Sequence, residues 1–198
     1  MPNKRVVAVD FDDLIYPTSE EKVDFLNQYG NTNISRSALF RCADPGLSSF
    51  WAQVDPNLGA KYGQRTDAYQ RQPIEGAREG IRDLAELAVI QILSSGYDEV
   101  RPLKTAWAAM HMPEISGAHY LGAGESKAEI CLKMGASLIL EDRYDYAREC
   151  ANAGIPAIVL LRYAWSYGVP HPLIKSVGKW EHIPLVARRI LASAQHSA

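Results

Sequence analysis

The sequence predicts an α/β protein with a doubly wound, Rossmann-like sheet of five parallel strands and a small helical cap inserted after the first strand. Short apolar runs rich in Val, Ile and Leu recur along the chain, as expected of strands that are buried on both faces. Segments with helical spacing of apolar residues separate these runs, and such alternation is typical of a parallel sheet. A long segment after the first run shows neither pattern, which marks it as an insertion.

Five apolar runs place the strands, in chain order at residues 6–9, 89–93, 118–121, 137–140 and 157–161. Helical stripes precede the second, fourth and fifth runs, formed in turn by Ala77, Ile81, Leu84 and Ala88, by Ala128, Cys131 and Met134, and by Ala147, Cys150 and Ala151. Ser126 and Glu129 have the spacing of a capping box, and Gly135 stands where a left-handed C-terminal cap belongs. A further short helix is expected over 185–191.

The insertion is expected to span residues 16–72, between two parts of a core domain at 1–15 and 73–198. It contains the breakers Tyr16-Pro17, Asp44-Pro45-Gly46 and Asp55-Pro56, several aromatic residues and no convincing strand. Since Pro and Gly interrupt regular structure, short helices joined by turns are the expected content of this cap.

Composition and charge restrict the class of partner. The chain has 198 residues, 47% of them hydrophobic and 22% charged, which suits one sizeable folded core. Its 21 Lys and Arg against 23 Asp and Glu give a net charge of −2, so neither a nucleic-acid polymer nor a membrane surface is expected to bind. Three cysteines without Cys-x-x-Cys spacing, and no apolar stretch of signal-peptide or membrane-span length, favour a cytoplasmic protein with a small-molecule partner.

Polar residues suited to phosphate or to a divalent metal follow the ends of three predicted strands. They are, in chain order, Asp10 and Asp12 after the first, Ser94 and Ser95 after the second, and Glu141 and Asp142 after the fourth. Loops at the carboxyl ends of a doubly wound sheet converge on one crevice, so we expect these groups to meet there. Lys127 begins the helix that leads into the fourth strand.

Each of these residues has a chemical and a plain structural interpretation. Asp10 and Asp12 repel each other unless a cation intervenes, and Mg²⁺ would serve because it binds carboxylates together with phosphate oxygens. A cation in a first helical turn, such as Lys127, is disfavoured by the helix dipole unless an anion such as phosphate faces it. The structural alternatives are turn or helix-cap roles for Asp10, Asp12 and Ser94, and a solvated surface position for Lys127.

The ordered set Asp10-x-Asp12, Ser94, Lys127 and Glu141-Asp142 resembles the four motifs of the haloacid dehalogenase superfamily. The resemblance covers nearly all of the chain apart from the insertion. It implies that Asp10 is a nucleophile forming an aspartyl-phosphate. It also implies that Asp12 is a general acid and base, which favours hydrolysis of phosphate esters over dehalogenation because an alkoxide leaving group needs a proton.

The same resemblance assigns the remaining residues. Ser94, the adjacent Ser95, and Lys127 would hold the phosphoryl group. Mg²⁺ would be bound by Asp10, by the backbone carbonyl of Asp12 and by Asp142, with Glu141 behind these ligands.

Within the superfamily, the chain is similar to cytosolic 5'(3')-deoxyribonucleotidases in its short cap, its Glu141-Asp142-Arg143 segment, its Lys104-Thr105-Ala106-Trp107 stretch and its Phe50-Trp51 pair. This implies a 5'-nucleotidase for (deoxy)ribonucleoside monophosphates. Phe50 or Trp51 would stack on the base, which is worth about 1–3 kcal/mol, although both residues equally suit the core of the cap. Lys104 is either a further phosphate contact or a solvated helix residue.

Two departures weaken the substrate assignment, because Glu141 replaces an aspartate of that subfamily and Ser94 stands where Thr is common. The alternatives are a phosphatase for another small metabolite, such as a sugar phosphate, and a non-catalytic phosphate-binding member. A signalling receiver domain is disfavoured, because here the lysine precedes the fourth strand and an acidic pair follows it. The resemblance is compatible with a homodimer.

Overall fold

The computed structural model describes residues 5–35, 38, 61–62, 69–95, 98, 100–122 and 124–193. These residues form one six-stranded sheet in the order β3-β2-β1-β4-β5-β6, with every pair of neighbours parallel. The strands are β1 (Val6–Val9), β2 (Val89–Ser95), β3 (Ile115–Leu121), β4 (Ala136–Glu141), β5 (Ala157–Leu160) and β6 (Ile174–Val177). This order is that of a doubly wound, Rossmann-like sheet and differs from the flavodoxin-like order 2-1-3-4-5 of a receiver domain. The predicted fold class is therefore confirmed.

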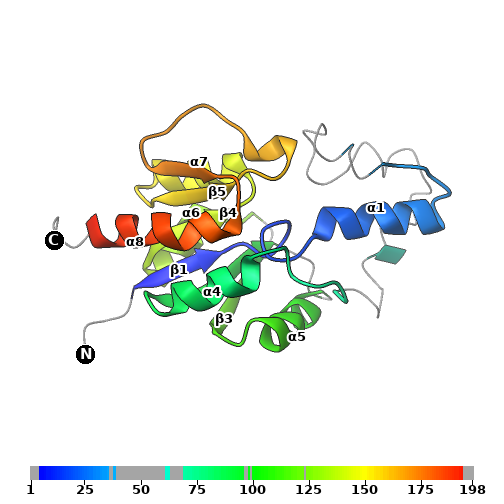
Figure 1. Ribbon diagram of the computed structural model, residues 1–198, viewed down its shortest axis with the longest axis horizontal. Helices are drawn as coiled ribbons and strands as arrows, with labels where there is room; N and C mark the ends of the chain where they lie inside the picture. Colours follow the sequence, from blue (N-terminus) through cyan, green and yellow to red (C-terminus); the bar gives the residue numbers. More distant parts are fainter. Residues whose placement is uncertain are drawn as a thin grey trace.

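Helices cover both faces of the sheet (Figure 1). Those of the core are α4 (Ala77–Ala85), α5 (Arg101–His111), α6 (Lys127–Met134), α7 (Tyr144–Asn152) and α8 (Ile183–Ser193). One hydrophobic cluster joins α4, α5 and α8 to one face, and a second joins α6 and α7 to the other. Both faces are covered, so the central strands β1 and β4 and the neighbouring β5 are largely apolar. Among the described residues, no helix is long and apolar enough to cross a bilayer.

The ends of α6 confirm Ser126 as the N-cap and Gly135 as the left-handed C-terminal cap, and they fix the position of Lys127. The hydroxyl oxygen of Ser126 accepts a hydrogen bond of 3.2 Å from the backbone N–H of Glu129. At the other end Gly135 has a φ of 66°, a left-handed conformation that glycine adopts without steric cost. The helix is therefore bounded on both sides, and Lys127 is its first residue.

The sheet has one strand more than the sequence predicts, and α5 was also not among the predicted helices. Strand β6 lies at the sheet edge, and only Ile174 and Val177 of its four residues are buried, so no apolar run marks it. In α5 one of the three buried residues is Lys104, which disguises the apolar stripe. Strand β3 begins at Ile115, three residues before the predicted run, because Ser116 and Gly117 interrupt the apolar pattern.

The insertion begins with helix α1 (Thr18–Tyr29), which extends past the carboxyl edge of the sheet (Figure 1). Tyr16 and Tyr69, near the two ends of the insertion, pack against Phe11 with ring centroids 5.6 and 5.5 Å away. Both ends are thus anchored on the core. Most of the segment between them, including Phe50 and Trp51, lies outside the described residues. The cap and its boundaries at 16 and 72 stay predictions.

Candidate active site

The acidic residues lie at the point where the winding of the sheet reverses. Strands β1 and β4 are neighbours there, and the backbone N–H of Asp10 continues their pairing with a 3.0 Å hydrogen bond to the carbonyl of Leu140. Asp10 follows β1, Glu141 ends β4, and Asp142 comes next. Ligands of doubly wound proteins bind in the crevice at this reversal. The fold therefore brings together acidic groups that are about 130 residues apart in the chain.

Asp10, Glu141 and Asp142 form the acidic group of the site. Each offers one carboxylate oxygen, and the three oxygens lie within 4.8 Å of one another. The residues are 4%, 0% and 2% exposed, respectively. The Oε2 atom of Glu141 is buried without a hydrogen-bond partner, which is costly for a carboxylate unless a cation completes its environment.

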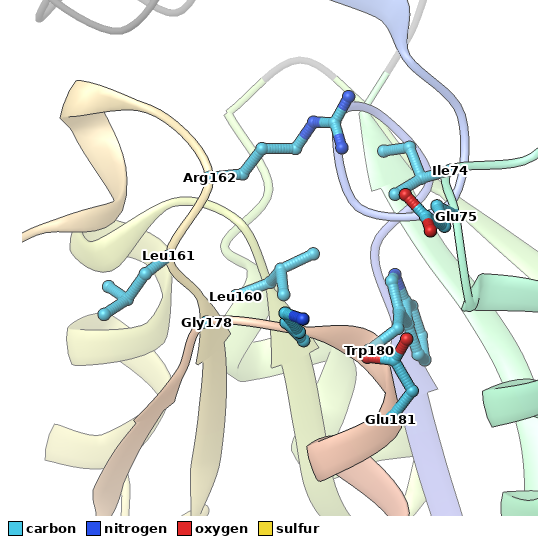
Figure 2. Close-up of a pocket in the computed structure, with 9 residues that line it drawn as sticks. Ile74, Glu75, Leu160, Leu161, Arg162, Gly178, Trp180 and Glu181 are labelled. Carbon is cyan, nitrogen blue, oxygen red and sulfur yellow. The ribbon is translucent and has the colours of Figure 1, made fainter.

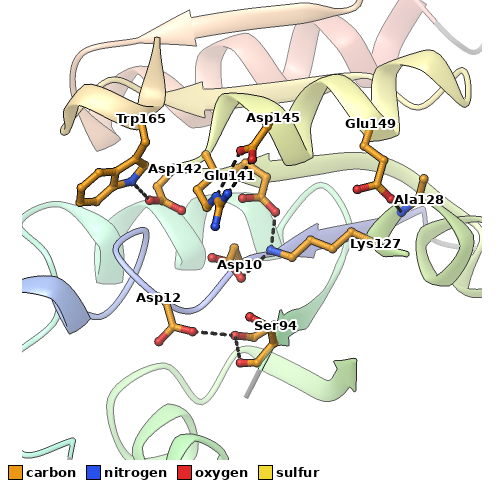
Figure 3. Close-up of polar contacts among 12 residues, drawn as sticks. Asp10, Asp12, Ser94, Lys127, Ala128, Glu141, Asp142, Asp145, Glu149 and Trp165 are labelled. Carbon is orange, nitrogen blue, oxygen red and sulfur yellow. Dashed lines mark hydrogen bonds and ion pairs between the residues drawn. The ribbon is translucent and has the colours of Figure 1, made fainter. Parts of the chain in front are cut away.

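Lys127 is the cation nearest to this group in the described part of the chain. Its Nζ donates to Oδ1 of Asp10 at 2.8 Å and to Oε1 of Glu141 at 2.5 Å (Figure 3). It is 3% exposed, so the solvated surface alternative is wrong. Burial by itself lowers the pKa of Lys127, but the carboxylates of Asp10 and Glu141 more than offset this, so its pKa is raised and Lys127 stays protonated.

The N-terminus of α6 has an anion of its own. The carboxylate of Glu149, on α7, accepts hydrogen bonds from the hydroxyl of Ser126 and, at 3.3 Å, from the backbone N–H of Ala128. Glu149 thus supplies the negative charge that the helix dipole favours. Lys127 is held by its own carboxylate partners rather than by an anion placed on the helix end.

The acidic group has more carboxyl groups than Lys127 can balance if all of them ionise. Burial raises the pKa of Glu141 to about 8, and it also raises the pKa values of Asp10 and Asp142 above the usual range. Carboxylates with raised pKa values in one buried cluster are stabilised by a bound cation. The donor set of hard oxygens suits Mg²⁺.

Asp12 lies on the other side of Asp10 and faces different partners. Its carboxylate accepts hydrogen bonds from Lys104 at 2.5 Å and Ser94 at 3.1 Å, and another from Thr18 at 2.6 Å. Partial burial raises the pKa of Asp12, but Lys104 and Thr18 outweigh this effect and the net shift is downward. The Asp12 side chain therefore belongs to an ion pair, outside the acidic group.

Lys104 links Asp12 to the two serines at the end of β2. Its Nζ donates to the hydroxyl oxygen of Ser94 at 3.1 Å and to the backbone carbonyl of Ser95 at 2.9 Å. Lys104 is 2% exposed, so its interpretation as a solvated helix residue is wrong. Ser94 is fully buried and faces the site, whereas Ser95 is exposed and contributes its carbonyl oxygen here.

A tight loop after β1 positions Asp10 and Asp12. The backbone N–H groups of Ile15 and Tyr16 both donate to the carbonyl of Phe11, at 3.2 and 3.0 Å. Asp13 has a φ of 60° in this loop, and its buried carboxylate accepts hydrogen bonds from the backbone N–H of Ser19 at 2.8 Å and from the Ser19 hydroxyl. Burial raises the pKa of Asp13 to about 7. Asp13 thus joins the loop to the first turn of α1.

Sequence reasoning missed two contacts of the site. Thr18 donates to Asp12 from the start of α1, and the indole Nε1 of Trp165 donates to Oδ2 of Asp142 at 2.5 Å. Trp165 lies in a loop after β5, with no periodic pattern around it. The signal that was available is the position of this loop at a carboxyl strand end, where the rule for doubly wound sheets places binding groups.

A separate pocket of about 160 Å³ lies beside the ends of β5 and β6 (Figure 2). Its lining comes from residues 74–75, 160–162 and 178–181 and includes none of the acidic, serine or lysine residues of the site. Two basic and two acidic side chains balance there, namely Arg162, Lys179, Glu75 and Glu181. Nothing in this lining favours a phosphorylated ligand.

No protein-family model matches the chain, and no curated protein matches its sequence. A haloacid dehalogenase-like family hydrolase from Xanthomonas campestris is similar in structure, with 14% identity, coverage of 98% of this chain and 99% of its own, and a TM-score of 0.64. YfnB from Bacillus subtilis, a HAD-hydrolase bound to magnesium, has 14% identity, coverage of 93% and 98%, and a TM-score of 0.60. CbbY from Rhodobacter sphaeroides, in complex with phosphate, has 10% identity, coverage of 91% and 96%, and a TM-score of 0.64.

These similarities establish the fold. The chain has the fold of the haloacid dehalogenase-like hydrolases, and it covers nearly the full length of each of the three proteins. At identities of 10–14% the activity of this chain does not follow from theirs. It has to be argued from the site.

Proposed function

We propose that this protein is a Mg²⁺-dependent phosphomonoester hydrolase of the haloacid dehalogenase superfamily, acting through an aspartyl-phosphate on Asp10. The observation that supports this most is the environment of Asp10. Its carboxylate lies in one buried group with Glu141 and Asp142 and is paired with Lys127 at 2.8 Å. A carboxylate so placed has one cation beside it and two further carboxyl groups with which it could share another, which suits attack on an anionic substrate.

The residues present fit Mg²⁺. Asp10 and Asp142 would hold it with carboxylate oxygens and Asp12 with its backbone carbonyl, and the unpartnered Oε2 of Glu141 supports a cation at this position. When bound, Mg²⁺ would neutralise charge on the phosphoryl oxygens. The magnesium in YfnB and the phosphate in CbbY, proteins of the same fold, agree with this proposal.

The chain's own residues then perform two half-reactions. Asp12 is ionised while Lys104 pairs with it, and it takes up a proton when Lys104 turns to the phosphoryl oxygens of the substrate. In the first half-reaction an oxygen of Asp10 attacks phosphorus, the bond to the ester oxygen breaks, and Asp12 gives that proton to the departing alkoxide. In the second, Asp12 takes a proton from water, which attacks phosphorus and releases inorganic phosphate and free Asp10. Lys127, Lys104 and Ser94 hold the phosphoryl oxygens. The contact of Lys104 with both Asp12 and Ser94 supports its assignment to this set.

Asp12 also supports ester hydrolysis over dehalogenation. A halide leaves without a proton, whereas an alkoxide needs one from a neighbouring acid. Asp12 is held by Lys104 and Thr18, outside the acidic group that contains Asp10. A carboxyl group beside the nucleophile can protonate an alkoxide, which ester hydrolysis requires and dehalogenation does not.

The finer proposal is a 5'-nucleotidase for (deoxy)ribonucleoside monophosphates. It rests on the resemblance of the Lys104–Trp107 stretch and of Phe50-Trp51 to cytosolic 5'(3')-deoxyribonucleotidases. Within that stretch, Lys104 contacts the site, whereas Trp107 packs on Phe11 and Tyr16 at centroid distances of 5.3 and 5.1 Å. Because Trp107 packs within the core, we assign stacking on the nucleobase to Phe50 or Trp51.

The test is phosphate release by the full chain from p-nitrophenyl phosphate, dUMP, dTMP, AMP and sugar phosphates, with and without Mg²⁺. We expect Mg²⁺-dependent release that is fastest on the nucleotides. No release from any of the esters by the folded protein would contradict the phosphatase proposal. Release that is fastest on a sugar phosphate would contradict the nucleotide preference and favour the other substrate class.

A further inference from the structure

The loop after β5 reaches the acidic group through one indole. Trp165 lies in a short 3₁₀ turn, Ala164–Ser166, and its Nε1 donates to Oδ2 of Asp142 at 2.5 Å (Figure 3). Trp165 is 7% exposed and Asp142 is 2% exposed, so water is largely excluded from this contact. Among the described residues, no other side chain donates a hydrogen bond to the Asp142 carboxylate.

The indole is held in place from its own side. The ring of Trp165 stacks on Tyr163, with centroids 4.6 Å apart and planes inclined by 25°. The turn is closed by reciprocal bonds, because Ser166 N–H donates to the Tyr163 carbonyl at 3.1 Å and Tyr163 N–H donates to the fully buried Ser166 hydroxyl at 3.3 Å. A donor with so little freedom fixes the orientation of the carboxylate that it binds.

An indole has properties that a cationic donor lacks. Its N–H donates and it carries no charge, so it occupies one oxygen of Asp142 without neutralising the carboxylate. The negative charge stays available to a metal ion, and the other oxygen keeps a defined direction. By contrast Lys127, which contacts Asp10 and Glu141, offsets part of their charge.

We propose that Trp165 is a positioning residue of the metal site, which orients Asp142 as a ligand and thereby raises the affinity for Mg²⁺. This inference rests on the proposed function, since it assumes that Mg²⁺ binds at the acidic group. Outer partners of metal ligands typically contribute about 10–100-fold in metal affinity. Trp165 holds no substrate atom and donates no proton in the reaction.

The test compares Trp165→Phe with Trp180→Phe in the full chain. Trp165→Phe keeps an aromatic ring that can stack on Tyr163 and removes the indole N–H together with the five-membered ring that carries it. Trp180 is a suitable control, because it is also buried, at 1% exposed, and its Nε1 donates at 2.8 Å to the carbonyl of Leu14 instead of to Asp142. Calorimetric titration with Mg²⁺ should show a dissociation constant raised about 10–100-fold in Trp165→Phe and changed less than about twofold in Trp180→Phe.

The Mg²⁺ dependence of turnover is a second measurement, which would not change if Trp165 had only a structural role. In Trp165→Phe the Mg²⁺ concentration for half-maximal phosphate release should rise by the same factor, while the rate at saturating Mg²⁺ stays within about threefold of wild type. Unchanged Mg²⁺ affinity in Trp165→Phe, alongside a wild type that binds Mg²⁺ and hydrolyses esters, overturns this inference and leaves the proposed function standing. A wild type that binds no Mg²⁺ overturns both.

A measurement on the wild type covers the case in which Trp165→Phe does not fold. In protein labelled with ¹⁵N-tryptophan, the indole N–H resonance of Trp165 should shift as Mg²⁺ is added, with a midpoint at the dissociation constant. Phe variants of the other three tryptophans assign the signals by elimination. An indole resonance of Trp165 that stays fixed at saturating Mg²⁺ overturns the inference.

Discussion

The two aspartates of the Asp10-x-Asp12 motif lie in different electrostatic surroundings. Asp10 belongs to a group of three buried carboxylates that shares one lysine, Lys127. Asp12 pairs with a lysine of its own, Lys104, and with two hydroxyl groups. As a result burial raises the pKa of Asp10, whereas the net shift of Asp12 is downward.

Under the proposed function, this difference gives the two halves of the site different tasks. The Asp10 half holds three carboxyl groups and one lysine, so all three carboxyl groups ionise readily only when a divalent cation is bound. The Asp12 half is balanced, and its lysine and hydroxyl groups are donors that a phosphoryl oxygen can share. One half therefore suits the metal and the nucleophile, and the other suits proton transfer and binding of substrate oxygens.

The largest expected effect is that of Asp10→Asn. The amide is a poor nucleophile of nearly the same shape, so phosphate release should fall by about 10⁴-fold or more. Steady-state kinetics measures the loss, and the thermal unfolding midpoint serves as the control. The midpoint should not fall, because the variant removes one charge from a crowded acidic group. Retained turnover would show that the nucleophile is another residue.

Asp12→Asn should lower turnover by about 10²–10⁴-fold, in a way that depends on the leaving group. A nucleoside leaves as an alkoxide and needs a proton, whereas p-nitrophenolate is stable without one. The loss should therefore be greater for nucleotides than for p-nitrophenyl phosphate, measured side by side on the same preparation. Equal losses on both substrates would argue against Asp12 as the general acid.

Lys104→Met should act mainly on substrate binding. It removes a charged donor from the balanced half, and a hydrogen bond of this kind is worth about 1.5–3 kcal/mol, so KM should rise by about 10–100-fold with a smaller change in kcat. Lys133→Met is a suitable control, because Lys133 is exposed on α6. A fall in kcat at unchanged KM would contradict this, because it would mean that Lys104 acts only through Asp12 and does not bind the substrate.

The smallest expected effect is a change in the free energy of unfolding with pH. Glu141 and Asp13 have pKa values raised to about 8 and about 7, so between pH 5 and 8 the folded state binds more protons than the unfolded state. Without Mg²⁺, the free energy of unfolding should therefore fall as pH rises through this range. Mg²⁺ at about 100 times its dissociation constant should add roughly 2.7 kcal/mol, and this gain should shrink at low pH where protons compete for the ligands.

Calorimetric thermal unfolding across this pH range checks the result. Stability of the metal-free protein that rises between pH 5 and 8 would contradict the effect of burial on the carboxyl groups of Glu141 and Asp13. The lowered pKa of Asp12 does not interfere, since the stability it contributes is lost only at more acidic pH, as the carboxylate becomes protonated.

Much of the core could be predicted because parallel strands that are buried on both faces leave continuous apolar runs. β1, β2, β4 and β5 have such runs, and the Ser126 and Gly135 caps have local chemistry that acts within a few residues. Strand β6 has no apolar run because one of its sides has no neighbour, and it escaped prediction. In the insertion the Pro and Gly breakers indicate short helices, whereas no apolar pattern defines where α1 begins and ends.

The site likewise contains residues whose positions could be predicted from the sequence and residues whose positions could not. Asp10, Ser94, Lys127 and Asp142 could be predicted to meet, because each lies at a strand or helix end that the topology brings to one crevice. The burial of Lys104 could not be predicted, because a lysine on a helix is normally solvated and only its tertiary partners make burial tolerable. The contact of Trp165 with Asp142 depends on the path of a loop, which no periodicity records.

The most direct test of the account is to trap the phosphorylated enzyme. The Mg²⁺-loaded protein is mixed with a phosphomonoester that it hydrolyses, quenched in acidic denaturant and reduced with borohydride, which converts an aspartyl-phosphate to homoserine. Peptide mass spectrometry then locates the altered residue, with Asp12→Asn as a variant that slows breakdown of the intermediate. The account predicts homoserine at position 10, dependent on Mg²⁺. Homoserine at any other position, or none during sustained turnover, would contradict it.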